Sequence, residues 1–145
     1  MAKKIVRLVA LACVFAAVLS LLPVRAKDGR DFAGFYELSD VSESGSTCQL
    51  TFTVRVFNYS DADVNNATLV LQDPLVPRAV YATFTGVEIR DRGNVRLSTQ
   101  VTVPRREYES WLKGGSPALD VQYTSAEGKS LRRRVELSRM PVGEE

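Results

Sequence analysis

Strict alternation of apolar and polar residues in the middle of the chain constrains the fold more than any other feature. Every second position is apolar, and the series is Cys48, Leu50, Phe52, Val54 and Val56. Successive side chains of a β-strand point to opposite faces, so all five share one face. This segment therefore predicts a strand with one buried and one solvated face.

Shorter runs of the same pattern recur along the chain. With the first run they give about seven or eight strands, and they lie at 35–41, 67–71, 80–89, 95–103, 119–123 and 135–137. Turn-forming residues separate them, and the turns at 91–94 and 125–129 have the composition of hairpin turns. Many short strands without a long helical period predict an all-β fold, an antiparallel sandwich over residues 34–139.

The alternation changes parity once, across Gly86. The apolar positions before it, from Val80 to Phe84, are even-numbered, whereas Val87 and Ile89 are odd-numbered. A glycine inside a strand pattern is typical of a bulge. We therefore expect a β-bulge or a sharp bend at Gly86.

One segment, at about 104–113, predicts a short helix. Pro104 suits the start of a helix, and two glycines follow the segment. Tyr108, Trp111 and Leu112 have the spacing of one helix face, so we expect all three to anchor the helix on the core at one end of the sandwich. The alternative is that Trp111 is exposed and binds a partner.

The first 26 residues have the pattern of a secretory signal peptide. Lys3, Lys4 and Arg7 precede an apolar run over 8–22, and Val24-Arg25-Ala26 has the form of a cleavage site. We therefore expect an exported protein, periplasmic or secreted. A polar lead-in over 27–33 and a tail over 140–145 would flank the sandwich.

Two alternatives to cleavage remain open. Residues 5–24 are long enough to cross a bilayer, so the segment could stay as an inner-membrane anchor. Lipidation of Cys13 is a third interpretation, although its flanking residues match a lipoprotein box poorly.

Composition excludes several function classes. The 145 residues include no histidine and two cysteines, which excludes histidine-based catalysis and histidine–zinc sites. All 17 acidic residues lie after residue 26, so removal of the signal leaves 15 basic residues and a net charge of −2. An exported and slightly acidic chain argues against binding of nucleic acid.

The predicted mature chain has a single cysteine, Cys48, and cannot form an intrachain disulfide. The thiol shares parity with Leu50 and Phe52, which predicts a buried structural residue. Catalysis by Cys48 would need a base, and the chain has no histidine to act as one.

Two segments carry a resemblance to a known type of domain. Val54–Ser60 (VRVFNYS), followed by Asn65–Leu71 (NNATLVL), resembles the second and third strands of bacterial extracytoplasmic immunoglobulin-like modules of the cell-adhesion-related type. Fibronectin type III-like domains are similar. The resemblance implies a seven-stranded sandwich with a binding, spacing or accessory role and no catalysis.

The run Arg132-Arg133-Arg134 is the clearest charged feature. On a strand Arg132 and Arg134 share one side, whereas Arg133 shares parity with the apolar residues around it. Arg133 would then reach water from the open end of the sandwich, unless a bulge resets the register.

The favoured interpretation of this run is an edge strand protected by charge. The alternative is a partner surface, in which Arg132 and Arg134, together with Arg105 and Arg106, dock to an anionic surface.

Asp61, Asp63 and Asn65 occupy the first three ligand positions of a calcium loop. Asn66 stands where such loops need glycine, and Gln72 stands where they need a bidentate carboxylate. A solvated loop is therefore favoured over a weak calcium site.

These features predict a non-catalytic module with an interaction, accessory or structural role at the cell envelope, acting on an unknown protein or envelope partner without a cofactor or metal. The alternatives are a membrane-anchored envelope protein and a hydrolase that uses carboxylates alone. Such a hydrolase needs two carboxyl groups about 5–10 Å apart in a concave cleft.

Overall fold

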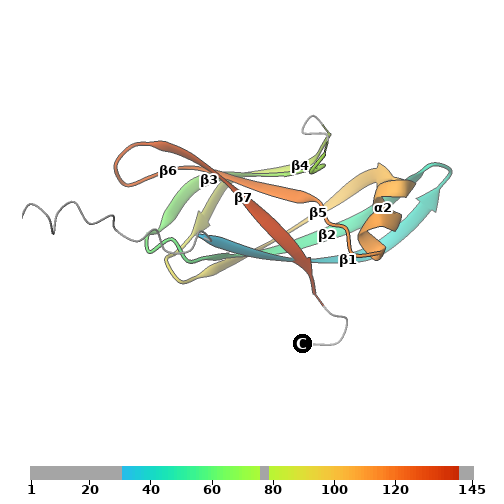
Figure 1. Ribbon diagram of the computed structural model, residues 1–145, viewed down its shortest axis with the longest axis horizontal. Helices are drawn as coiled ribbons and strands as arrows, with labels where there is room; N and C mark the ends of the chain where they lie inside the picture. Colours follow the sequence, from blue (N-terminus) through green and yellow to red (C-terminus); the bar gives the residue numbers. More distant parts are fainter. Residues whose placement is uncertain (1–30, 76–78, 141–145) are drawn as a thin grey trace, which may run out of the picture.

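The computed structural model of the chain describes residues 31–75 and 79–140, and these form seven strands and one short helix (Figure 1). In chain order the elements are β1 (Phe32–Ser44), β2 (Thr47–Asn58), β3 (Val64–Gln72), β4 (Val80–Ile89), β5 (Asn94–Pro104), α2 (Arg105–Leu112), β6 (Ala118–Thr124) and β7 (Ser130–Arg139). The predicted signal segment lies outside the described residues. Within the described part, no helix has the length and apolar character of a membrane span.

The strands form one sheet in the order β4-β3-β6-β7-β1-β2-β5, and this sheet folds into two layers (Figure 1). β1, β2 and β5 make one layer, and β4, β3, β6 and β7 make the other. The core is built from the inward residues of both layers, including the five alternating side chains of β2. The predicted all-β, immunoglobulin-like sandwich with one short helix is confirmed.

The two layers join where β7 crosses from β6 to β1. β7 first pairs antiparallel with β6 and then runs parallel to β1 from Gly34↔Leu137 to Tyr36↔Arg139. The sheet is therefore mixed, and the expectation of a purely antiparallel fold is wrong at this point. Gly34 permits the crossing because a Cβ atom there would lie 2.5 Å from Cδ2 of Leu137.

β1 begins within the segment predicted as a polar lead-in. Phe32 is buried, and its ring meets that of Tyr123 edge-to-face at 5.6 Å. Phe32 and Tyr36 are both at even-numbered positions, and both are buried. The inward-facing residues of β1 therefore begin at Phe32, two positions before residue 34. The lead-in therefore ends before Phe32, because burial of this ring extends the strand.

The bulge expected at Gly86 is confirmed. The glycine has φ +65°, and the pairing of β3 with β4 shifts between Ala67↔Val87 and Leu69↔Phe84. The extra residue on β4 brings Val87 back to the inner face, which explains the change of parity.

The turn at 91–94 does not make the expected hairpin, because β4 and β5 lie in different layers and β5 pairs with β2. Asn58, at the end of β2, fixes this corner instead. Its buried Nδ2 donates to the carbonyls of Ala62 (2.8 Å) and Ile89 (2.9 Å), and its backbone N–H donates to that of Gly93 (2.9 Å). The other predicted hairpin, at 125–129, joins β6 to β7.

Candidate functional site

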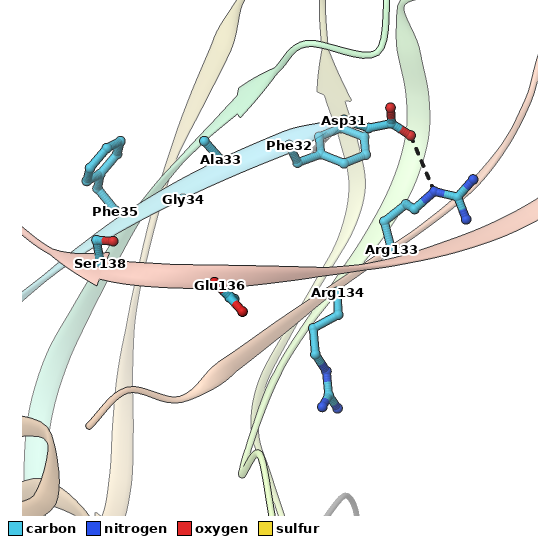
Figure 2. A pocket seen from close by; sticks show the side chains of 9 residues that line it. All are labelled: Asp31, Phe32, Ala33, Gly34, Phe35, Arg133, Arg134, Glu136 and Ser138. Carbon is cyan, nitrogen blue, oxygen red and sulfur yellow. Dashed lines mark hydrogen bonds and ion pairs between the residues drawn. The ribbon is translucent and has the colours of Figure 1, made fainter. Parts of the chain in front are cut away.

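The three consecutive arginines of β7 point to two sides of the strand. Arg132 and Arg134 both reach Asp120, whereas Arg133 pairs with Asp31 across 3.3 Å from Nε to Oδ2 (Figure 2). The β6–β7 pairing runs without a shift from Thr124 to Ala118, so no bulge resets the register. Arg133 therefore reaches water at the end of the sandwich, the first of the two arrangements expected.

β7 is not an edge strand of the sheet, so the favoured interpretation of the arginine run is wrong. It lies between β6 and β1 in the strand order. Its pairing with β1 begins only at Leu137, which leaves the side of the strand next to the arginines open toward β1.

The carboxylate of Asp120 contacts two of the three arginines, on the outer side of β7. Its side chain is only 2% exposed. The Oδ2 atom accepts from Nε2 of Gln72 (2.7 Å) and from Nε (3.0 Å) and Nη2 of Arg132, while Oδ1 lies 3.5 Å from Nε of Arg134. One buried carboxylate therefore orients two guanidinium groups from the strand beside it.

The charges of Asp120, Arg132 and Arg134 sum to +1, and the carboxyl group of Glu136 lines the same groove as Arg134. Asp120 supplies one negative charge, and Arg132 and Arg134 supply two positive charges on half-exposed side chains. Arg134 directs Nε toward the carboxylate, and its guanidinium carries two further nitrogens that can donate to a ligand. The arrangement suits an anionic group, because fixed guanidinium forks bind carboxylate and phosphate in a bidentate manner.

A groove of about 430 Å³ lies beside this cluster, where β1 and β7 separate (Figure 2). Arg134 and Glu136 line it from β7, and Phe35 lines it from β1. Asp31 and Glu136 are its two carboxyl groups, but Asp31 is already paired with Arg133. The groove is thus a mixed-charge surface between two strands.

Arg105 and Arg106 lie elsewhere, at the start of α2. They line a separate hollow of about 520 Å³ next to the β1–β2 turn. Arg105 pairs with Glu43 at 3.7 Å, and Arg106 pairs with its neighbour Glu107 at 3.9 Å. The sequence interpretation groups all four arginines on one candidate surface, but the two pairs line different hollows and contact different acidic residues.

The residues of the candidate calcium loop are engaged in other contacts. Asp61 forms a 2.7 Å ion pair with Arg92, and Oδ1 of Asp63 accepts from the backbone N–H of Asp91 at 2.7 Å. Asn65 belongs to β3. In the ranges 31–75 and 79–140, no three acidic or cysteine residues gather as a metal site would require.

Trp111 is the main contact of α2 with the core. It is buried between Phe52 and Tyr81, with ring centroids 6.1 and 5.6 Å away. Tyr108 is partly buried on the same side. Trp111 is therefore not exposed as a binding platform.

Leu112 was expected to share this buried face, and that expectation is wrong, since the residue is 46% exposed. Consecutive helix positions differ by about 100°, so with Trp111 pointing at the core Leu112 lies on the flank of the helix, where it is exposed.

Cys48 is fully buried and unpaired, on the same side of β2 as Leu50 and Phe52. Burial leaves the thiol without access to solvent, which is the setting of a small apolar core residue.

Tyr81 lies between the helix and the loop that follows β3. Its hydroxyl donates to Oδ2 of Asp73 at 3.3 Å, and Oδ1 of Asp73 accepts from the N–H of Leu75 at 2.7 Å. Burial raises the pKa of the Tyr81 phenol above its ordinary value, and the carboxylates of Glu107 and Asp73 raise it further. The phenol is therefore a neutral hydrogen-bond donor.

The sequence analysis missed Asp120 and Gln72. A signal for Asp120 was present, because the hairpin turn at 125–129 places Asp120 directly opposite Arg134. The burial of Gln72 had no such signal, since it depends on the pairing of β3 with β6.

No protein-family model matches the chain, and no curated protein matches it in sequence. Among solved structures it is similar to the structural-genomics target SoR45, with 8% identity over 72% of this chain and 80% of that one and a TM-score of 0.42. It is also similar to an inactive variant of a GH20 exo-β-N-acetylglucosaminidase from Vibrio harveyi, with 12% identity and a TM-score of 0.43. That match covers 74% of this chain and 18% of the glycosidase. At these TM-scores neither likeness supports a conclusion about activity.

Proposed function

We propose that the chain is an exported, non-catalytic module of the cell envelope that docks to an anionic surface through Arg132 and Arg134. The observation that carries the proposal is the buried Asp120, which holds the guanidinium groups of two side chains that are 60% and 51% exposed. Ordinary surface arginines lose side-chain entropy when they bind. Here part of that entropy is already lost when the protein folds, because the carboxylate orients both side chains before any partner binds.

Export rests on the signal pattern of the first 26 residues. The absence of histidine argues against most acid–base catalysis. The carboxylate-hydrolase alternative would have to use Asp31 and Glu136 in the groove, and release of Asp31 from Arg133 would be its first requirement.

Co-sedimentation with vesicles tests the proposal. The chain is expressed with its own N-terminal segment, and the purified exported protein is mixed with vesicles of phosphatidylglycerol and phosphatidylcholine, or of phosphatidylcholine alone. We expect binding only to the anionic vesicles, weakened about fivefold by each of Arg132→Gln and Arg134→Gln, since a basic residue near such a surface contributes about 1 kcal/mol.

Arg106→Gln is the matched control, because it removes the same charge from a side chain that is 85% exposed. A urea midpoint for each variant separates loss of binding from loss of folding. Equal binding by the wild type and the Arg132→Gln/Arg134→Gln double variant, with both folded, would contradict the proposal.

A further inference from the structure

Three aromatic rings and two arginines gather on the outer side of the β1–β2–β5 layer. We refer to them as the aromatic–arginine face, and its members are Phe35, Phe57, Tyr59, Arg55 and Arg96. The inward residues of the same strands, such as Val54 and Val56, are fully buried, so these side chains point outward.

The rings form a continuous exposed cluster. Phe35 meets Phe57 edge-to-face at 5.9 Å, and Phe57 stacks nearly parallel to Tyr59 at 6.4 Å. Phe35 is 38% exposed and Tyr59 is 47% exposed. The rings thus contact each other and still present apolar surface to solvent. Figure 2 shows Phe35 at the end of the groove between β1 and β7.

Arg55 and Arg96 stand directly opposite each other on β2 and β5, in one row with Phe35. Like charges in this position destabilise a sheet. Among the described residues neither Arg55 nor Arg96 forms an ion pair. Glu37 is the acidic residue of the next row on β1, and it lies opposite Thr53 and not opposite either arginine. The two positive charges therefore remain uncompensated, which favours an anionic ligand.

The next rows of β2 and β5 offer neutral hydrogen-bonding groups, and Glu37 of β1 lies beside the first of these rows. The next outward pairs of β2 and β5 are Thr53 with Ser98, Thr51 with Gln100, and Gln49 with Thr102. The hydroxyls of Thr53 and Ser98 lie 2.9 Å apart; Thr53 is buried, whereas the exposed hydroxyl of Ser98 can still bond to a ligand. No aliphatic side chain occupies these paired outward positions of β2 and β5.

We propose that the aromatic–arginine face binds an acidic polysaccharide. The C–H faces of sugar rings pack on the electron-rich faces of Phe35, Phe57 and Tyr59. Sugar carboxylates pair with the opposed guanidinium groups of Arg55 and Arg96. Sugar hydroxyls then bond to the threonine, serine and glutamine side chains of the following rows. This ligand goes beyond the proposed docking through β7, and either surface can fail alone.

Isothermal titration with polygalacturonate tests the inference on the exported protein used above. We expect measurable binding that weakens as salt is added, and no binding of the neutral polysaccharide dextran. Arg55→Gln and Arg96→Gln should each weaken binding about tenfold, as expected for loss of a charged hydrogen bond. Phe35→Ala should weaken it as well, because the sugar would lose its stacking surface.

Arg106→Gln again serves as the matched charge control and should leave the affinity unchanged. Arg55→Lys keeps the charge and loses the planar fork, so it guards against misfolding of the glutamine variant and should give an intermediate loss.

Three results would overturn the inference. The first is equal affinity for poly-L-glutamate of the same charge together with full binding by Phe35→Ala, which would indicate an acidic protein partner. The second is loss of binding only in the Arg132→Gln and Arg134→Gln variants, which would assign the polysaccharide to β7. The third is no binding of polygalacturonate by the folded protein.

Discussion

The carboxylate of Asp120 accepts two hydrogen bonds from the guanidinium of Arg132 on the neighbouring strand. The acid is buried, whereas the arginine is more than half exposed. A carboxylate withdrawn from water is costly unless its partners are in place, so this pair differs from an ordinary surface ion pair. The stability of the β6–β7 hairpin and the orientation of its arginines therefore depend on the same residue.

Replacement of Asp120 by asparagine should lower the free energy of unfolding by about 1–3 kcal/mol, because the charged acceptor of three donors is lost. Urea unfolding measures the change. Asp31→Asn is the control, since the pair that it breaks is half exposed and should contribute at most about 1 kcal/mol. Equal effects of the two substitutions would show that the burial of Asp120 has no energetic consequence.

Gly34→Ala should destabilise the protein by about 1–3 kcal/mol, because the added methyl group would overlap Leu137 at the crossing of β1 and β7. The φ angle of Gly34 is not in the left-handed region, so the penalty is one of space. Thermal unfolding measures it. Leu137→Val removes the overlapping methyl group, and the double variant should lose less stability than the two single changes predict together. Strict additivity would contradict the packing argument.

Trp111→Ala should cost about 3–5 kcal/mol, because a large buried ring between Phe52 and Tyr81 is lost. Leu112→Ala on the same helix should change stability by less than about 1 kcal/mol, since this side chain is exposed. Fluorescence gives an independent readout because Trp111 is the only tryptophan. We expect blue-shifted native emission that moves to the red in urea, and emission typical of water-exposed indole in the native protein would refute burial.

Alkaline pH should destabilise the fold through Tyr81. Its pKa is raised in the folded state from the ordinary value of 10.0, first by burial and then by Glu107 and Asp73. Above that ordinary value the unfolded chain loses the phenolic proton while the folded chain retains it, so stability falls as pH rises toward the folded pKa. The urea midpoint should therefore drop between about pH 9 and about pH 11. Tyr81→Phe should show a smaller drop, and an unchanged pH dependence would contradict this assignment.

Much of the fold could be predicted from the sequence because period-two alternation is a local property. The strand at 47–58, the bulge at Gly86 and the helix after Pro104 depend on residues close in the chain, and all three are present. The register of the β6–β7 hairpin is also local. It brings Asp120 opposite Arg134, so this part of the candidate site lay within reach of sequence reasoning.

Other features depend on strands that are far apart in the sequence. The turn at 91–94 has the composition of a hairpin turn. The strands that it connects, β4 and β5, nevertheless lie in different layers, because β5 pairs with β2. The aromatic–arginine face likewise exists only because that pairing places Arg96 beside Arg55. Leu112 has the spacing of an anchor, but the core reaches α2 from one side only.

The sequence by itself determined that the elements are strands with one short helix, which face of most strands is buried, and the absence of histidine chemistry. Tertiary structure alone decided which strands far apart in the chain are neighbours, the parallel pairing of β1 with β7, and the burial of Gln72 against Asp120. The physical reason is that side-chain alternation specifies an orientation relative to the core but not a partner. The partner is chosen by packing and loop closure over the whole chain, as the close approach of Gly34 to Leu137 illustrates.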